Sequence, residues 1–524
     1  MARSETQENH EHPQTPERAA TATGTMSRQD VVVIALLLMS AFVVILNETT
    51  MGVALPPIMD ELGITAATGQ WLTTAFMLTM AVVIPATGWL IQRLGTRRAY
   101  VVAMSLFSAG TLLASLAPGF GPLLVGRIVQ ASGTAIMLPL LMTTIMTLVP
   151  PMSRGKVMGN VAIVMSAAPA LGPTLSGAVL EISGWRTIFL VVLPIALTAL
   201  VLGAIFVRDT AERKSTRLDP LSLLLAVLAF GGLVYGLSSL GEAAEATPLV
   251  PVWVPIVGGA LALGLFVWRQ LSLQRTDSAL LDLRVFAARD FTIGLSILAI
   301  AMVGLFGSII LIPLYLQNVL GLEPLATGLI VLPGGLMMGL LGPTVGRLYD
   351  RVGPRPLVIP GTALVTGAMA MLATVSSTTA PWFVLCSHIV LSLGLAFVFT
   401  PLFTSALAAL KPQLYSHGSA AISTVQQLAG AAGTALFIAV MTTVSVSAEE
   451  SGATEVAALG EGVREAFVWG AVVVGFALVA SFWLRKPPPV EESVDGPRHE
   501  EVGAEGVGAQ RPATDEPIDR TPVH

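Results

Sequence analysis

One stretch of this sequence occurs twice, 258 positions apart (343 − 85), and it decides the fold. The first copy reads Pro85-Ala-Thr-Gly88-Trp-Leu90-Ile-Gln92-Arg93-Leu-Gly95-Thr-Arg97. The second reads Pro343-Thr-Val-Gly346-Arg-Leu348-Tyr-Asp350-Arg351-Val-Gly353-Pro-Arg355. In each copy a long apolar run ends in a tight, basic turn. An internal repeat in a chain of apolar runs is typical of membrane transporters built from two related bundles.

The composition requires a membrane around this repeat. Of the 524 residues, 54% are hydrophobic and 12% are charged, whereas about 25% are charged in an ordinary soluble protein. A single cysteine, Cys386, excludes a disulfide within the chain. The six histidines show no metal-ligand spacing, and no phosphate-binding loop, zinc-protease motif or nucleophile elbow is present. The sequence therefore predicts neither an enzyme nor a nucleotide-driven pump.

A membrane-spanning helix needs about 20 apolar residues. Continuous apolar runs without a period of two favour helices over a β-barrel. We predict fourteen spans, at about 31–55, 68–91, 99–117, 121–149, 157–180, 187–207, 219–240, 250–270, 291–317, 325–346, 357–376, 381–410, 417–444 and 465–484.

The charges between the spans sort to two sides. One side carries the bases Arg93, Arg97, Arg98, Arg154, Lys156, Arg208, Arg213, Lys214, Arg217, Arg269, Arg275, Arg284, Arg289, Arg347, Arg351, Arg355, Lys411, Arg485 and Lys486. The other side carries the acids Asp60, Glu61, Glu181, Glu242, Glu245, Glu449 and Glu450. An odd number of spans would scramble this sorting. The positive-inside rule predicts both termini in the cytoplasm and a multi-pass protein of the cytoplasmic membrane.

The repeat also divides the chain. We predict a first six-helix bundle at 29–208, two inserted helices with basic linkers at 209–289, and a second six-helix bundle at 290–486. The polar segments 1–28 and 487–524 contain too few apolar residues to form a core, so we expect them to be disordered. The metal-site interpretation of His10 and His12 is disfavoured by their spacing.

Three stretches place polar or small residues inside spans. The first span contains Leu46-Asn47-Glu48-Thr49-Thr50, and the fourth contains Arg127-Ile-Val-Gln130-Ala-Ser-Gly133. A charge within a membrane span is costly and requires a partner or a wet cavity. The fifth span contains Ala168-Pro169-Ala-Leu-Gly172-Pro173-Thr-Leu-Ser176-Gly177. Ala168, Gly172 and Ser176 recur every four residues, and such a small face lets helices pack closely.

These motifs together resemble the major facilitator superfamily, and within it the fourteen-helix drug:proton antiporters. The region 88–98 resembles the family's Gly-x-Leu-x-Asp-Arg-x-Gly-Arg-Arg turn, with Gln92 in place of Asp, and Arg127 and Gln130 match its Arg-x-x-Gln-Gly-x-Gly motif. Gly172, Pro173 and Gly177 resemble the antiporter motif of exporters. Asn47 and Glu48 stand where the family usually has Leu-Asp-x-Thr, which resembles a lincomycin-type efflux subgroup. The resemblance implies an all-α polytopic membrane protein of major facilitator fold, with two six-helix bundles and two inserted helices.

The resemblance also implies a role for the repeated turns, which latch the inner gate in this family. The residues concerned are Gly88, Arg93, Gly95, Arg97, Gly346, Asp350, Arg351, Gly353 and Arg355. The alternative is that these turns are only basic anchors that set the topology.

Glu48 is the clearest acid inside a span. If the first helix ends near Val53, Glu48 lies about 8 Å below the outer surface, and Arg127 lies about 9 Å below it at 1.5 Å per residue. We predict that the two interact across the cavity and that Glu48 carries the coupled proton. The alternative is a static salt bridge between the first and fourth helices.

Other polar residues are predicted to face the same cavity, because lipid does not satisfy polar side chains in a span. We assign the substrate cavity to Asn47, Gln130, Tyr315, Gln317, Gln426 and Gln427. Asn47 points about 100° away from Glu48 around the helix. Some of these residues instead serve as hydrogen-bonding contacts between helices in an ordinary bundle.

We therefore predict proton-coupled export of lipophilic or cationic drugs or antibiotics by alternating access. The partners expected are a small lipophilic substrate, protons and the lipid bilayer, with no nucleic acid, no cofactor beyond the proton gradient, and function as a monomer. One alternative is an exporter dedicated to a single metabolite or self-made antibiotic. A more distant alternative is a membrane-embedded sensor or enzyme.

Overall fold

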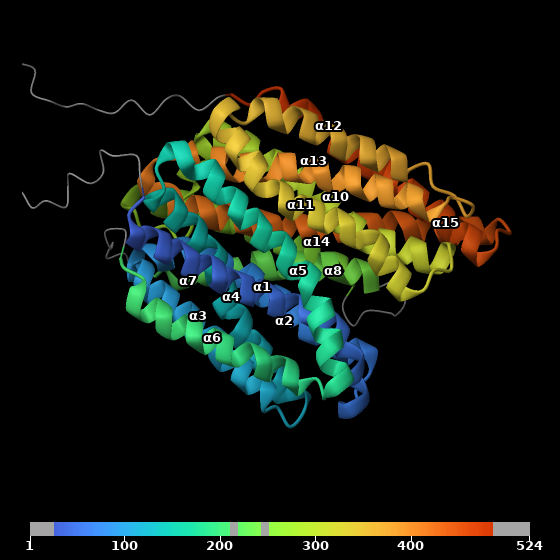
Figure 1. The fold of residues 1–524 in the computed structure, drawn as a ribbon, viewed down its shortest axis with the longest axis horizontal. Helices are drawn as coiled ribbons and strands as arrows, with labels where there is room; N and C mark the ends of the chain where they lie inside the picture. The colour runs from blue at the N-terminus through green and yellow to red at the C-terminus, as the bar shows by residue number, and fades with distance from the viewer. Residues whose placement is uncertain (1–25, 210–217, 243–250, 486–524) are drawn as a thin grey trace, which may run out of the picture. The chain divides into compact units, whose positions relative to one another are not determined.

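A computed structural model describes residues 26–209, 218–242 and 251–485 (Figure 1). Residues 1–25 and 487–524 of the two predicted disordered tails lie outside these ranges, as do the predicted linker charges Arg213, Lys214, Arg217, Glu245 and Lys486 and the side chain of Glu242. The prediction of disorder is wrong for Ser27 and Arg28, which cap and begin the first helix.

The described residues form helices and contain no strand. The helices are α1 (Arg28–Leu62), α2 (Ala66–Leu94), α3 (Thr96–Ser115), α4 (Phe120–Leu148), α5 (Arg154–Ile182), α6 (Arg186–Phe206), α7 (Pro220–Ala226), α8 (Gly232–Glu242), α9 (Trp253–Leu273), α10 (Arg289–Leu314), α11 (Pro324–Val352), α12 (Arg355–Leu372), α13 (Pro381–Ala408), α14 (Tyr415–Glu450) and α15 (Glu455–Ser481). A π-helical turn at Val227–Gly231 joins α7 to α8, and another at Tyr315–Val319 extends α10. Within these ranges fourteen helical segments are long and apolar enough to cross a membrane, which confirms the predicted number.

The first helix differs from its predicted length. It begins at a capping box, in which the Ser27 hydroxyl accepts from the Asp30 N–H and Asp30 accepts in return. It continues through Pro56 and Pro57 to Leu62, although each proline removes a helical hydrogen bond. Ile58 is fully buried in a cluster with residues of α2 and α6, and this burial favours the extra turns.

The six helices at each end of the described chain pack mainly among themselves. In the first half α3 packs on α4 and α6, and α1 packs on α5; in the second half α12 packs on α13, and α14 packs on α10 and α15. The two halves meet along α5 with α11 and α2 with α14. The fold is therefore the predicted one, two six-helix bundles with two inserted helices.

The inserted pair, α7–α8 and α9, packs on itself and on both halves. Gly232 and Gly259 let its two helices approach, since a side-chain carbon added at Gly232 would meet the Cα atom of Gly259 at 3.1 Å. Its partners in the two halves are α2 and α14. The ring of Tyr235 on α8 stacks on Trp71 of α2 with centroids 6.0 Å apart. The insertion thus lies against one helix of each half.

The described hydrogen bonds between the halves gather at one end of the helices. We call this the basic end, because α1 begins there and the bases of the repeated turns lie there. The hydrogen bonds that join the halves involve the last turns of α2, α4 and α11 and the first turns of α5 and α14. Both copies of the repeat therefore lie at the junction of the two bundles.

Candidate functional site

Glu48 lies on α1, farther from the end of this helix than the sequence predicts. It precedes Leu62 by 14 residues (62 − 48), or about 21 Å along the helix axis. α1 therefore does not end near Val53, and the depth of Glu48 below the outer surface stays a prediction. Its neighbour Asn47 is 1% exposed, and neither its amide oxygen nor its amide nitrogen has a hydrogen-bond partner among the described residues. The helix thus places an acid beside a buried, unsatisfied amide.

Arg127 lies on α4 and is 1% exposed. Its Nη1 donates to Gln130 Oε1 at 2.6 Å, and its guanidinium lies 4.1 Å from the centre of the Phe76 ring on α2. Its Nε is buried without a partner in the described part of the chain. A buried guanidinium with an unused donor retains the capacity to bind a further acceptor.

We predict from the sequence that Glu48 and Arg127 interact across the cavity. Among the residues described they form no direct ion pair; the side chain of Arg127 is occupied by Gln130 and Phe76 instead. Among the described residues, Glu48 and Arg127 therefore form no static salt bridge between α1 and α4. Their predicted interaction and their role in proton coupling stay predictions.

The remaining predicted cavity residues occupy three kinds of environment. Gln130 is fully buried, and its Nε2 donates to Thr111 on α3 at 2.8 Å. Tyr315 is also buried, and its hydroxyl donates to the Ser376 carbonyl at 2.6 Å. Gln317 is exposed, and Gln426 and Gln427 are half-buried on α14. In this structure Gln130 and Tyr315 connect helices or loops, and their assignment to a substrate cavity stays a prediction.

The antiporter-like segment of α5 packs against α1, as its small face predicts. A side-chain carbon added at Gly172 would meet the Leu46 carbonyl oxygen at 3.1 Å and would also press on Thr49. The Ser176 hydroxyl donates to the Thr50 carbonyl at 3.1 Å. Pro173 lies within α5, and a side-chain carbon at Gly177 would meet nothing within 4 Å. The packing prediction for this face is confirmed, and α5 contacts Leu46, Thr49 and Thr50, which flank Asn47 and Glu48 in the sequence.

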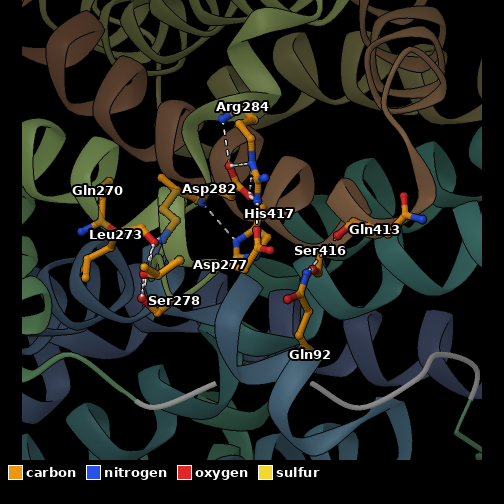
Figure 2. Close-up of polar contacts among 12 residues, drawn as sticks. Gln92, Gln270, Leu273, Asp277, Ser278, Asp282, Arg284, Gln413, Ser416 and His417 are labelled. Atoms are coloured by element: carbon orange, nitrogen blue, oxygen red, sulfur yellow. Dashed lines mark hydrogen bonds and ion pairs between the residues drawn. The ribbon is translucent and has the colours of Figure 1, made fainter. Parts of the chain in front are cut away.

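The first repeated turn reaches from the first half to the second. Gln92 Nε2 donates to the Gln413 carbonyl at 2.9 Å and to Ser416 Oγ at 3.1 Å, both just before or within the first turn of α14 (Figure 2). Arg97 is directed elsewhere, with its Nε and Nη2 donating to the Ala204 carbonyl of α6 at 3.0 and 2.6 Å. The amide that replaces the family's carboxylate therefore makes a contact between the halves.

The second turn makes the equivalent contact in reverse. Asp350 Oδ1 accepts from the Gly155 N–H at 2.8 Å, and Oδ2 accepts from the Lys156 N–H at 2.9 Å, at the start of α5. A carboxylate is favoured there because the first N–H groups of a helix are unpaired and carry partial positive charge. Each copy thus holds the beginning of a helix in the opposite half, one through an amide and one through a carboxylate.

Two glycines explain why these turns are tight. Gly95 has φ of 78° and Gly353 has φ of 81°, a region that side chains disfavour. Gly346 lies against the backbone of Gly155, where a side chain would collide with the carbonyl oxygen. Arg93, Arg351 and Arg355 are exposed at the same end. The geometry agrees with a latch between the halves, and the gating role assigned to these residues stays a prediction.

A third contact at the basic end was not predicted from the sequence. Gln270, Asp282 and His417 hold the segment that follows the inserted helices against α14 (Figure 2). The available signal was Leu280-Leu281 followed by Asp282, an apolar pair in a segment interpreted only as a basic linker. No group of histidines, cysteines and carboxylates suited to a metal ion occurs in the described ranges.

Comparison with known proteins agrees with this architecture. The model of the Major Facilitator Superfamily matches residues 37–434. The lincomycin resistance protein LmrB of Listeria monocytogenes is 40% identical over 474 residues, covering 89% of this chain and 99% of that protein. The multidrug resistance protein B homolog of Mycobacterium tuberculosis is 33% identical, covering 76% of this chain and 73% of that protein.

A solved structure supports the fold. The proton:xylose symporter XylE, with 16% identity, superimposes with a TM-score of 0.61 over 88% of this chain and 97% of its own. The fourteen helices, the repeated turns at the junction of two bundles and the family match over most of the sequence agree: this chain belongs to the major facilitator superfamily.

Proposed function

We propose that this protein exports lipophilic or cationic drugs or antibiotics across the cytoplasmic membrane in exchange for protons, by alternating access of its two bundles. The support from relatives is the resemblance to a lincomycin resistance protein along almost its full length. The observation that supports the proton coupling is the buried Arg127 of α4, whose Nε has no partner among the described residues, together with the buried and unsatisfied amide of Asn47, the neighbour of Glu48 on α1.

The proposed cycle uses the charge of Glu48. A protonated Glu48 is neutral and no longer attracts Arg127, whereas an ionised Glu48 attracts both Arg127 and a cationic substrate. Asn47 adds an unsatisfied amide next to this acid, which suits a polar group of the substrate. Binding of the substrate and of the proton therefore compete at one place, as exchange requires.

The orientation belongs to the proposal. By the positive-inside rule the basic end faces the cytoplasm. The contacts of Gln92 with α14 and of Asp350 with α5 then close the cytoplasmic end, and export requires that they break and re-form in each cycle.

Efflux from cells that lack their own pumps tests the proposal. We expect cells expressing the chain to lose ethidium and to resist lincomycin, with both effects abolished by a protonophore. Glu48→Gln is expected to abolish the protonophore-sensitive efflux, because the amide does not ionise. Glu181→Gln, at an exposed acid of α5, is the matched control and should retain the protonophore-sensitive efflux.

Two results would contradict the proposal. Full proton-driven efflux by Glu48→Gln would exclude Glu48 as the coupling residue. A wild-type protein that reaches the membrane but moves neither compound would favour the exporter of a single metabolite, to be sought by screening natural products.

A further inference from the structure

The inserted helices are joined to the second half by residues 277–288, which we call the strap. It begins at Asp277, after the 3₁₀ turn Gln274–Thr276 that follows α9. The left-handed backbone of Asp277 (φ 50°) turns the chain, and the strap ends where α10 begins at Arg289. Three of its apolar side chains are at most 5% exposed, those of Leu280, Leu281 and Val285. A connection of this kind is normally exposed and mobile, so its burial indicates a packed structural element.

Gln270 fixes the strap to the inserted pair. This residue of α9 is fully buried, and its Oε1 accepts from the Leu280 N–H at 2.8 Å and the Leu281 N–H at 3.3 Å. Its Nε2 donates to Ser222 of α7 at 2.8 Å. One side chain therefore satisfies two buried backbone groups of the strap and joins both inserted helices.

His417 fixes the strap to the second half. The Asp282 N–H donates to His417 Nδ1 at 3.3 Å, in the first turn of α14 (Figure 2). The Asp282 carboxylate accepts from Arg284 Nε at 2.9 Å, and Arg284 also pairs with Asp277 at the start of the strap. Burial alone would raise the pKa of Asp282, but the hydrogen bonds from Arg284 hold it below its ordinary value. The strap thus presents an ionised, internally paired carboxylate beside His417.

His417 also lies where α2 of the first half touches α14. A side-chain carbon at Gly88 of α2 would lie 3.0 Å from the His417 Cα atom and 3.2 Å from the Ser416 carbonyl oxygen. Gln92, one turn further along α2, bonds to Ser416. The same turn of α14 is therefore held by α2 on one side and by the strap on the other.

We infer that the inserted helices and their strap form a brace that holds the basic end closed. The brace lies against α2 and α14, the helices that must separate for this end to open, and its last segment is fastened to α14 through Asp282 and His417. Opening of the basic end requires that the strap detach from α14 or move with it away from α2. The inserted pair is then a part of the gate and not only a peripheral addition.

This inference rests on the proposed alternating-access cycle, but its test needs neither a substrate nor a proton gradient. Spin labels at Arg98 and Pro356, exposed residues of the first and second halves at the basic end, report its opening by pulsed electron paramagnetic resonance. Cys386 is first replaced by Ser, because it is exposed and would also be labelled. The full-length protein is measured in lipid nanodiscs.

His417→Ala removes the acceptor on α14, and Gln270→Ala removes the acceptor on α9. Each is expected to raise the population with the longer distance about two- to tenfold, the range for the loss of one or two hydrogen bonds. His417→Asn keeps an acceptor near the same place and should restore the wild-type distribution. Arg275→Ala, at an exposed residue just before the strap, is the matched control and should leave the distribution unchanged.

The result that would overturn the brace is an unchanged distribution in both alanine variants, each shown to be folded and monodisperse by size-exclusion chromatography. An equal shift in Arg275→Ala would overturn it as well. If the distances shift as expected while wild type moves no drug, the brace stands and the proposed substrate is wrong.

Discussion

At the scale of single residues, the two copies of the repeat perform one task with different chemistry. Gln92 donates to a carbonyl and a hydroxyl of the opposite half, whereas Asp350 accepts two backbone N–H groups of the opposite half. The amide suits acceptors at the start of α14, and the carboxylate suits donors at the start of α5. The glutamine and the aspartate at equivalent positions of the two copies therefore bind partners of opposite hydrogen-bonding character.

Asp350→Asn tests the carboxylate latch. The amide keeps one acceptor but turns a donor toward an N–H of α5, so one hydrogen bond and the charge at the helix start are lost. We expect the free energy of unfolding to fall by about 1–2 kcal/mol, visible as a lower melting temperature of the purified protein. Arg351→Gln, at the exposed neighbouring residue, is the control. An equal fall in the control would contradict the latch.

At the scale of elements, α1 and α5 depend on close approach. The backbone of Gly172 faces Thr49 and Leu46, so no side chain fits there without a shift of α1. Gly177, one and a half turns further on, faces open space. The two glycines of one motif therefore differ in their tolerance of a side chain.

Gly172→Val is expected to destabilise the protein by about 1–3 kcal/mol, the usual cost of overpacking, and to reduce efflux by moving α1 and Glu48. Gly177→Ala should be neutral or stabilising by up to about 1 kcal/mol, because alanine favours a helix more than glycine does. Thermal unfolding and ethidium efflux of the two variants provide the comparison. Equal tolerance at both positions would show that α1 and α5 do not pack as described.

At the scale of the whole molecule, the insertion is fastened at both of its ends. Asp219, which precedes α7, accepts from Arg269 at the end of α9 at 3.0 and 3.1 Å. The hydrogen bonds of Arg269 lower the pKa of Asp219 from 3.8 to about 2. The ion pair therefore joins the beginning of the first inserted helix to the end of the second, just before the strap begins.

This pKa sets the expected pH dependence. Because the folded value is lower than the unfolded one, the stabilisation is fully present above pH 3.8 and is lost as the pH falls toward 2. Asp219→Asn should lower the melting temperature by the same amount at pH 5 and pH 8. A difference that disappears by pH 5 would show that Asp219 is not held as described. The effect is expected to be small, since both side chains are partly exposed.

The number of spans and the place of the repeat were determined by the sequence alone, since hydropathy over about 20 residues is a local property. The same holds for the small face of α5, because i, i+4 spacing places residues on one side of a helix whatever lies opposite. The end of α1 was predicted wrongly, because Pro56 and Pro57 are helix breakers locally and the burial of Ile58 prevails only in the packed protein.

Only the tertiary structure decided which partners the polar side chains contact. Arg127 bonds to Gln130 and packs on Phe76 rather than pairing directly with Glu48, and Gln92 reaches α14, more than 300 positions along the chain. The strap was interpreted as a plain linker because nothing near it in sequence shows that Gln270 and His417 will meet it. Contacts of this kind depend on which helices become neighbours, and that is set by the packing of all fourteen spans together.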